Sequence, residues 1–100
     1  MMKKLEEVLK ESRQYKIYKT EINKAIGHKI KTFRVAFDMT KFSLAERIGI
    51  TYQQLSNYEN AKSSITVERL YKIAIIFNTE IQNLLPTNES LNQIYNNIVK

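Results

Sequence analysis

The chain has 100 residues and a mass of 11.8 kDa, enough for one small domain but too little for two packed domains with a catalytic cleft. Hydrophobic residues make up 43% and charged residues 26%, which is typical of a globular chain rather than a disordered one. The chain has no cysteine, which excludes disulfides and thiolate chemistry and favours a cytoplasmic location. No apolar run reaches the roughly 18 residues of a membrane span, so we expect no membrane partner.

The charge of the chain is positive and unevenly distributed. Sixteen basic and ten acidic residues give a formal net charge of +6, which suits a polyanionic partner but is also common in lysine-rich proteins. Residues 1–24 carry seven bases and four acids, residues 25–62 carry six and three, and residues 63–100 carry three and three. The cationic surface therefore belongs to the first two thirds of the chain.

The residues that most enzymes need are scarce. There is one histidine, His28, one aspartate, Asp38, and two glycines, with no glycine-rich phosphate loop and no metal-ligand spacing. The glutamates have no carboxylate partner at helical spacing that would divide acid and base roles between them. His28 is assigned no role, because a single surface histidine is more often simply exposed. We therefore expect no catalytic residue, no metal and no cofactor.

The two glycines and the single proline, with apolar residues three and four apart, predict an all-α fold. In the first third, an apolar stripe from Leu5 to Leu9 predicts a short helix that ends near Ser12. Residues 15–18 are expected to form an irregular connector, and Thr20 to cap a longer second helix. That helix is expected to end near Asp38-Met39 and to bury Ile22, Ala25 or Ile26, Ile30, Phe33 and Phe37.

The middle of the chain predicts two short helices joined by a tight turn. Thr40 is a good N-cap, and Gly49 is placed to end the helix that Thr40 begins. Thr51 and Gln54 have the spacing of a capping box, so a second short helix begins at once and runs to about Asn60. Two short helices that meet across such a turn have the layout of a helix-turn-helix.

The last third predicts two helices that complete the core and one that lies outside it. Residues 62–64 form a polar loop, and Thr66 caps the next helix. A short helix over residues 81–85 is stopped by Pro86, and an amphipathic helix follows. The residues expected to face inward from the Thr66 helix are Val67, Leu70, Ile73, Ala74 and Phe77.

Three segments carry a resemblance to a known family. They are Gly27-His28-Lys29-Ile30-Lys31-Thr32-Phe33-Arg34, Ser43-Leu44-Ala45-Glu46-Arg47-Ile48-Gly49-Ile50-Thr51, and Leu55-Ser56-Asn57-Tyr58-Glu59-Asn60. They make residues 25–85 similar to the Xre/Cro/cI-type helix-turn-helix family of bacterial and phage transcriptional regulators. The resemblance implies a five-helix lambda-repressor-like domain over 25–85. The residues outside it are expected to form a basic helical extension over 1–24 and an extra amphipathic helix over 86–100.

At three positions the chain departs from this family. Members usually have glutamine at the position of Lys41, glycine at that of Ala61, and often proline at that of Ile65. Lys41 can still contact a phosphate as a point charge, with a steeper salt dependence. If the backbone at Ala61 is left-handed, its Cβ costs about 1–2 kcal/mol.

The resemblance also implies which residues contact DNA. Gln53 can bond N6 and N7 of adenine, whereas the amide of Gln54 is divided between base contact and the capping box. The alternatives for these residues are solvent exposure, helix capping or a turn. Arg34 and Glu59 match a structural ion pair, with two independent surface charges as the alternative. The base-contact candidates are Tyr52, Gln53, Gln54 and Asn57, and the phosphate candidates are Thr40, Lys41, Thr51, Asn60 and Lys62.

A regulator of this kind is expected to bind double-stranded DNA as a homodimer, because one recognition helix buries too little DNA surface for both affinity and specificity. The candidate dimer surface is the C-terminal stripe of Leu91, Ile94, Tyr95 and Ile98. The alternative is that Leu5, Val8 and Leu9 cover this stripe within the same chain, and that the protein dimerises only on DNA or through the Leu84-Leu85 region. A second functional hypothesis is a protein-interaction module such as an antitoxin or an adaptor, and an enzyme is the least supported reading.

Overall fold

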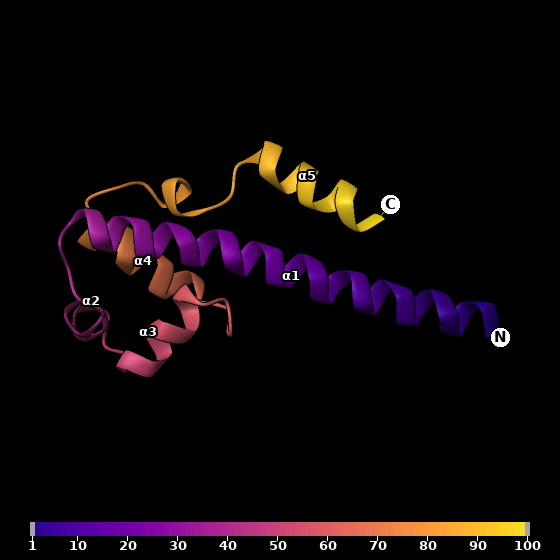
Figure 1. Cartoon of the computed structure of the whole chain (residues 1–100), viewed down its shortest axis with the longest axis horizontal. Coiled ribbons are helices and arrows are strands. Elements are labelled where there is room, and N and C mark those ends of the chain that lie inside the picture. Colours follow the sequence, from indigo (N-terminus) through magenta and orange to yellow (C-terminus); the bar gives the residue numbers. More distant parts are fainter. Residues whose placement is uncertain (1, 100) are drawn as a thin grey trace.

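A computed structural model describes residues 2–99 of the chain, and every regular element in that range is a helix (Figure 1). The predicted all-α class is therefore confirmed. The elements are α1 (Met2–Ala36), α2 (Lys41–Ile48), α3 (Tyr52–Glu59), α4 (Val67–Ile76), the 3₁₀ helix η1 (Ile81–Leu84) and α5 (Asn88–Val99).

The first third of the chain forms one helix instead of the two that were predicted. Helix α1 runs through 35 residues without a break. The hydroxyl of Thr20 donates to the carbonyl oxygen of Lys16 at 2.9 Å, so Thr20 lies inside the helix and does not cap it. No glycine or proline precedes Gly27, and nothing in the local sequence forces the helix to end. The expected domain boundary at residue 24 thus falls inside α1, whose first turns project beyond the other helices (Figure 1).

The hydrophobic core lies between the C-terminal half of α1 and the helices α2, α3, α4 and η1. Ile30 of α1 is completely buried, and the ring of Phe33 stacks on that of Phe77 with centroids 5.6 Å apart. Two residues that were predicted to be buried are exposed instead. Phe37 contacts Phe77 by its edge but keeps half of its surface exposed, and Val67 is exposed because it begins α4 on the side turned from the core. The core residues are Ile30, Leu44, Ala45, Ile48, Leu55, Leu70, Ile73, Ala74, Phe77 and Leu84.

The caps predicted around the tight turn are all present. The hydroxyl oxygen of Thr40 accepts from the backbone N–H of Ser43 at 3.0 Å, and Gly49 ends α2 with a φ of 74°. Thr51 and Gln54 form the complete capping box at the start of α3. Thr66 caps α4 through the N–H of Arg69. These caps fix α2 and α3 at the short spacing of a helix-turn-helix.

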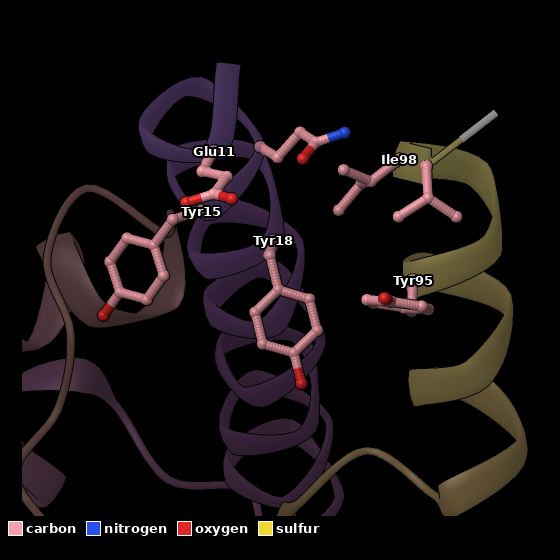
Figure 2. Close-up of a pocket in the computed structure, with 7 residues that line it drawn as sticks. Glu11, Tyr15, Tyr18, Tyr95 and Ile98 are labelled. Carbon is pink, nitrogen blue, oxygen red and sulfur yellow. The ribbon is translucent and has the colours of Figure 1, made fainter. Parts of the chain in front are cut away.

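The C-terminal helix packs on α1 rather than outside the compact unit. Helix α5 runs antiparallel to α1, and Leu91 shares a hollow with Tyr18 and Ile22 (Figure 1). Leu91, Ile94 and Ile98 are half-buried, whereas Tyr95 is exposed. Figure 2 shows Tyr95 and Ile98 directed from α5 towards the side of α1 that bears Tyr18, across an open groove of about 370 Å³.

The stripe of Leu5, Val8 and Leu9 does not cover α5. All three side chains are about half exposed, on the part of α1 that projects from the molecule. The cover for α5 comes from the middle of α1, around Tyr18 and Ile22. The N-terminal stripe therefore stays about half exposed instead of packing on α5.

Candidate nucleic-acid interface

The exposed face of α3 carries two side-chain amides that are hydrogen-bonded to each other. Nε2 of Gln53 donates to Oδ1 of Asn57 at 3.0 Å, one helical turn further along. This bond leaves Oε1 of Gln53 free to accept, one N–H on Gln53 free to donate, and both N–H groups of Asn57 free. The two amides are therefore held in position with donors and acceptors still available, the chemistry that base edges in a major groove require.

Gln54 is used differently from Gln53. Its Oε1 accepts from the backbone N–H of Thr51 at 3.0 Å, while the hydroxyl oxygen of Thr51 accepts from the N–H of Gln54 at 3.0 Å. The carbonyl oxygen of the Gln54 amide is thus engaged in the capping box. Only its N–H groups remain, so Gln54 could donate to guanine or to a phosphate but could not bond adenine in two places without opening the box.

The N-terminal ends of α2 and α3 share an exposed aromatic pair that was not predicted from the sequence. The rings of Phe42 and Tyr52 have centroids 4.5 Å apart, and Nζ of Lys41 lies 5.7 Å from the centroid of Tyr52. Phe42 is 70% exposed. The sequence signal was present, because Phe42 lies off the apolar stripe that buries Leu44 and Ile48. An aromatic side chain at such a position has no core to fill.

The expected phosphate contacts form two groups, one at each end of α3. Thr40, Lys41 and Thr51 lie at the starts of α2 and α3, where backbone N–H groups and the helix dipoles favour anions. Asn60 and Lys62 lie beyond the other end of α3 and are both exposed. The hydroxyls of Thr40 and Thr51 already accept from backbone N–H groups within the caps. Thr40 keeps its own hydroxyl proton to offer to a phosphate, whereas the proton of Thr51 is donated to Oε1 of Gln54 at 3.4 Å.

A buried ion pair holds α3 against α1. Nε of Arg34 donates to one carboxylate oxygen of Glu59 at 2.7 Å, and Nη2 donates to the other at 3.0 Å. The Glu59 side chain is only 1% exposed, and Arg34 also donates to the carbonyl oxygen of Met39 at 2.9 Å. The pair implied by the resemblance is therefore present in two-pronged geometry, and it fixes the end of α3 on the long helix.

A close approach between backbones does the same about two turns earlier in α1. An ideal Cβ added to Gly27 would lie 2.5 Å from the carbonyl oxygen of Tyr58 and 2.7 Å from that of Glu59. Any side chain at this position would push α3 away from α1. The sequence signal for Gly27 was an isolated glycine inside a helical pattern, which usually has a packing reason.

Neither a metal site nor a membrane span is indicated for residues 2–99. Among them, no three histidine, aspartate or glutamate side chains gather where a metal ion could be held. None of the helices in the same range has the length and apolarity needed to cross a bilayer.

The fold and the amide-bearing face of α3 define a helix-turn-helix protein. A model of the helix-turn-helix family matches residues 30–84, more than half of the chain. The chain belongs to the Xre/Cro-like helix-turn-helix family.

Two curated relatives show what the chain is similar to. An HTH-type transcriptional regulator from Archaeoglobus fulgidus is 36% identical over 56 residues, which cover 56% of this chain and 79% of that protein. The antitoxin PezA of Streptococcus pneumoniae is 33% identical over 69 residues, which cover 69% of this chain and 44% of PezA. The chain thus spans less than half the length of PezA, and the same holds for a transcriptional regulator from Rhodospirillum rubrum.

Two solved structures have a similar fold. The clp gene regulator ClgR of Corynebacterium glutamicum aligns with a TM-score of 0.60 at 18% identity, over 77% of this chain and 76% of that one. Hydroxypropylphosphonic acid epoxidase from S. wedmorenis aligns with a TM-score of 0.62 at 25% identity, over 67% of this chain but only 36% of the enzyme. Most of the epoxidase chain therefore has no counterpart here.

Proposed function

We propose that the protein is a sequence-specific transcriptional regulator that places α3 in the major groove of double-stranded DNA. The observation that carries this proposal is the Gln53–Asn57 amide pair, exposed on a helix that Arg34 and Glu59 anchor to α1. The ion pair that anchors α3 is buried, whereas the two amides are exposed. The amide-bearing face of α3 is therefore both rigidly supported and accessible to a ligand. Rigid support with exposed amides is what direct readout of base edges needs. The role is non-catalytic and cytoplasmic.

Each group on this face has a distinct role in the proposal. Gln53 and Asn57 read base edges, with adenine as the favoured partner of the Gln53 amide. Phe42 and Tyr52 provide an apolar contact for thymine methyl groups or sugars at the edge of the site. Gln54 donates through its free N–H groups. The groups at either end of α3 position it on the two flanking backbones: Thr40, Lys41 and Thr51 at one end, Asn60 and Lys62 at the other.

Selection of DNA by the protein tests this proposal. The protein is incubated with random-sequence duplexes, and the enriched duplex is titrated beside a scrambled copy at physiological salt. Specific sites are typically bound at least about 10³-fold more tightly than other DNA, so we expect a preference of that order. Equal affinity for the two duplexes would contradict the proposal, because the charge of the protein alone explains unspecific binding.

The proposal includes binding as a homodimer to two half-sites about one helical turn apart. The three aliphatic residues of the α5 stripe already face α1, so the exposed part of that stripe is Tyr95. Replacing Tyr95 by lysine opposes a two-fold contact there, and circular dichroism checks that α5 stays folded, because Tyr95 also lines the groove beside Tyr18. Light scattering is expected to show a dimer for the natural protein and a monomer for Tyr95→Lys; an unchanged mass would remove α5 from the dimer surface.

The likeness to PezA supports a second candidate function, a module that binds a protein partner as an antitoxin does. In this alternative, the exposed face of α3 either binds the protein partner or has no binding role. Affinity capture from the native host separates the two. A stoichiometric protein partner together with no preference for any selected duplex would favour the alternative.

A further inference from the structure

A cationic hollow lies between the middle of α1 and the loop that follows α3. It has a volume of about 270 Å³ and is open to solvent. Lys16 and Lys19 line it from α1, and Lys62, Ser63 and Ser64 line it from the loop. All three lysines are exposed, and no carboxylate is among the lining residues in the described part of the chain. Three positive charges thus face one small space without a counter-charge.

A hydrogen bond beside the hollow ties the loop to α1. Nδ2 of Asn23 donates to the hydroxyl oxygen of Ser64 at 2.9 Å, across 41 positions of sequence. This bond leaves the hydroxyl proton of Ser64 free to donate to a ligand. The loop turns sharply at Ala61, whose φ of 59° is left-handed, and this turn carries Lys62 back towards α1. The loop therefore lies beside α1, with Lys62 on one side of the hollow and the two α1 lysines on the other.

We infer that this hollow binds backbone phosphates of duplex DNA beside the bases that α3 contacts, an inference that rests on the proposed function. The loop begins where α3 ends, so Lys62 lies next to the recognition surface and the two α1 lysines continue the line of charge away from it. Lys16 and Lys19 are three residues apart, about 4.5 Å along the helix axis. The hollow extends the DNA footprint beyond that of the helix-turn-helix alone.

The chemistry favours a polyanion over a single small anion. Exposed ammonium groups with no buried donor beside them gain little from one free phosphate ion, because water screens them. On DNA, each lysine that neutralises a phosphate also releases condensed counterions, which is the main source of affinity. Free inorganic phosphate remains the other source of the same chemical group, and the experiment separates the two.

The experiment compares the salt dependence of DNA binding between two variants with the same net charge. Lys16→Gln/Lys19→Gln removes the α1 side of the hollow. Lys10→Gln/Lys72→Gln removes two exposed lysines that do not line it. Binding of the full chain to a scrambled 30-base-pair duplex is measured over a range of salt concentrations. The slope of log K against log salt is expected to fall in magnitude by about 1.8 for the first variant, about 0.9 per lost contact, and to stay unchanged for the second.

Ethylation interference on the selected duplex locates the contact. Phosphates outside the selected bases are expected to block binding of the natural protein when ethylated, but to have no effect on Lys16→Gln/Lys19→Gln. Equal slopes for the two variants, no such phosphates, or absence of any DNA binding would overturn the inference. So would a thermal shift with millimolar inorganic phosphate that the first variant abolishes while its DNA binding stays normal. If the slopes of the two variants differ as expected but the natural protein shows no preference for the selected duplex, the result would instead contradict the proposed function.

Discussion

The two halves of α1 share one helix but have different physical support. In the C-terminal half, Ile30 is completely buried and Gly27 touches the backbone of α3. Near the N-terminus, before the turns of α1 that face α5, Leu5, Val8 and Leu9 are about half exposed. The C-terminal half is held by tertiary packing, whereas these first turns depend mainly on helix propensity and on their continuity with the rest of α1. One element therefore serves as a rigid mount for α3 at one end and as a solvent-exposed extension at the other.

The largest expected effect comes from a proline placed in each half. Thr32→Pro removes a helix hydrogen bond and clashes with the carbonyl of His28, at a cost of about 3 kcal/mol or more in the part of α1 that holds the core. Thr32 is itself exposed, so no core side chain is lost. We expect loss of the cooperative thermal transition by circular dichroism.

Lys10→Pro is the matched change in the exposed half. It should reduce the helical signal while shifting the unfolding free energy of the domain by less than about 0.5 kcal/mol, because the turns before it expose Leu5, Val8 and Leu9 and contribute no core residue. If the two prolines destabilise the domain equally, the N-terminal half is packed in solution and the comparison between the halves is wrong.

The second prediction concerns ion pairs at two places on α1. Arg34→Ala leaves the Glu59 carboxylate buried without a partner, so we expect a loss of about 3–5 kcal/mol in urea denaturation. A double-mutant cycle of Arg34→Ala and Glu59→Ala should give a coupling of about 0.5–3 kcal/mol. The control is the exposed Lys24–Glu21 pair, at 3.3 Å, where the coupling should stay below about 0.5 kcal/mol. Additive losses in the first cycle would show that the pair does not hold α3.

The third prediction compares the two glycines. Gly27→Ala should destabilise by about 1–3 kcal/mol because its Cβ meets backbone oxygens that cannot rotate away, although alanine is the better helix former. A Cβ at Gly49 would meet no atom within 4 Å, so Gly49→Ala should lower the free energy of unfolding only through its left-handed φ of +74°, by about 1–2 kcal/mol.

DNA binding separates these two glycine variants further. Gly27→Ala displaces α3, so its affinity for the selected duplex should fall even at temperatures where it is folded. Gly49→Ala should bind normally under the same conditions. Normal binding by folded Gly27→Ala would mean that the close approach does not set the position of α3.

The smallest expected effect is a gain in stability. Ala61 has a φ of 59°, which a Cβ disfavours, so Ala61→Gly should stabilise the domain by up to about 1 kcal/mol, measured as a rise in thermal midpoint. Asn78→Gly is the control at a φ of 51°, because asparagine tolerates this conformation and should gain less. A loss of stability in Ala61→Gly would show that the methyl group contributes more by packing than it costs by strain.

The parts of the fold that could be predicted depend on residues close together in sequence. Thr40, Gly49 and Thr51 define their helix ends within a few residues, and the structure reproduces each of them. Thr20 could not be assigned in this way. A threonine hydroxyl can cap a new helix or bond back to the carbonyl four residues earlier, and the local sequence is the same in both cases.

In the candidate nucleic-acid interface, too, the features that could be predicted depend on residues close together in sequence. The residues of α3 were predicted from the resemblance, and the Gln53–Asn57 bond has the four-residue spacing of neighbours on a helix. The hollow could not be predicted, because it brings Lys19 next to Lys62. Residues 15–18 were expected to interrupt the helix just before Lys19, whereas α1 continues through them. Contacts between distant segments need the course of the whole chain.

The most direct test of the account is the preference of Gln53→Ala for the selected duplex over its scrambled copy. Loss of a bidentate base contact is worth about 1–3 kcal/mol, so the preference should fall roughly 5- to 150-fold while binding to the scrambled duplex stays the same. Gln93→Ala, an exposed glutamine on α5, should change neither affinity. An equal loss on both duplexes, or no loss on either, would contradict the claim that α3 reads DNA sequence through Gln53.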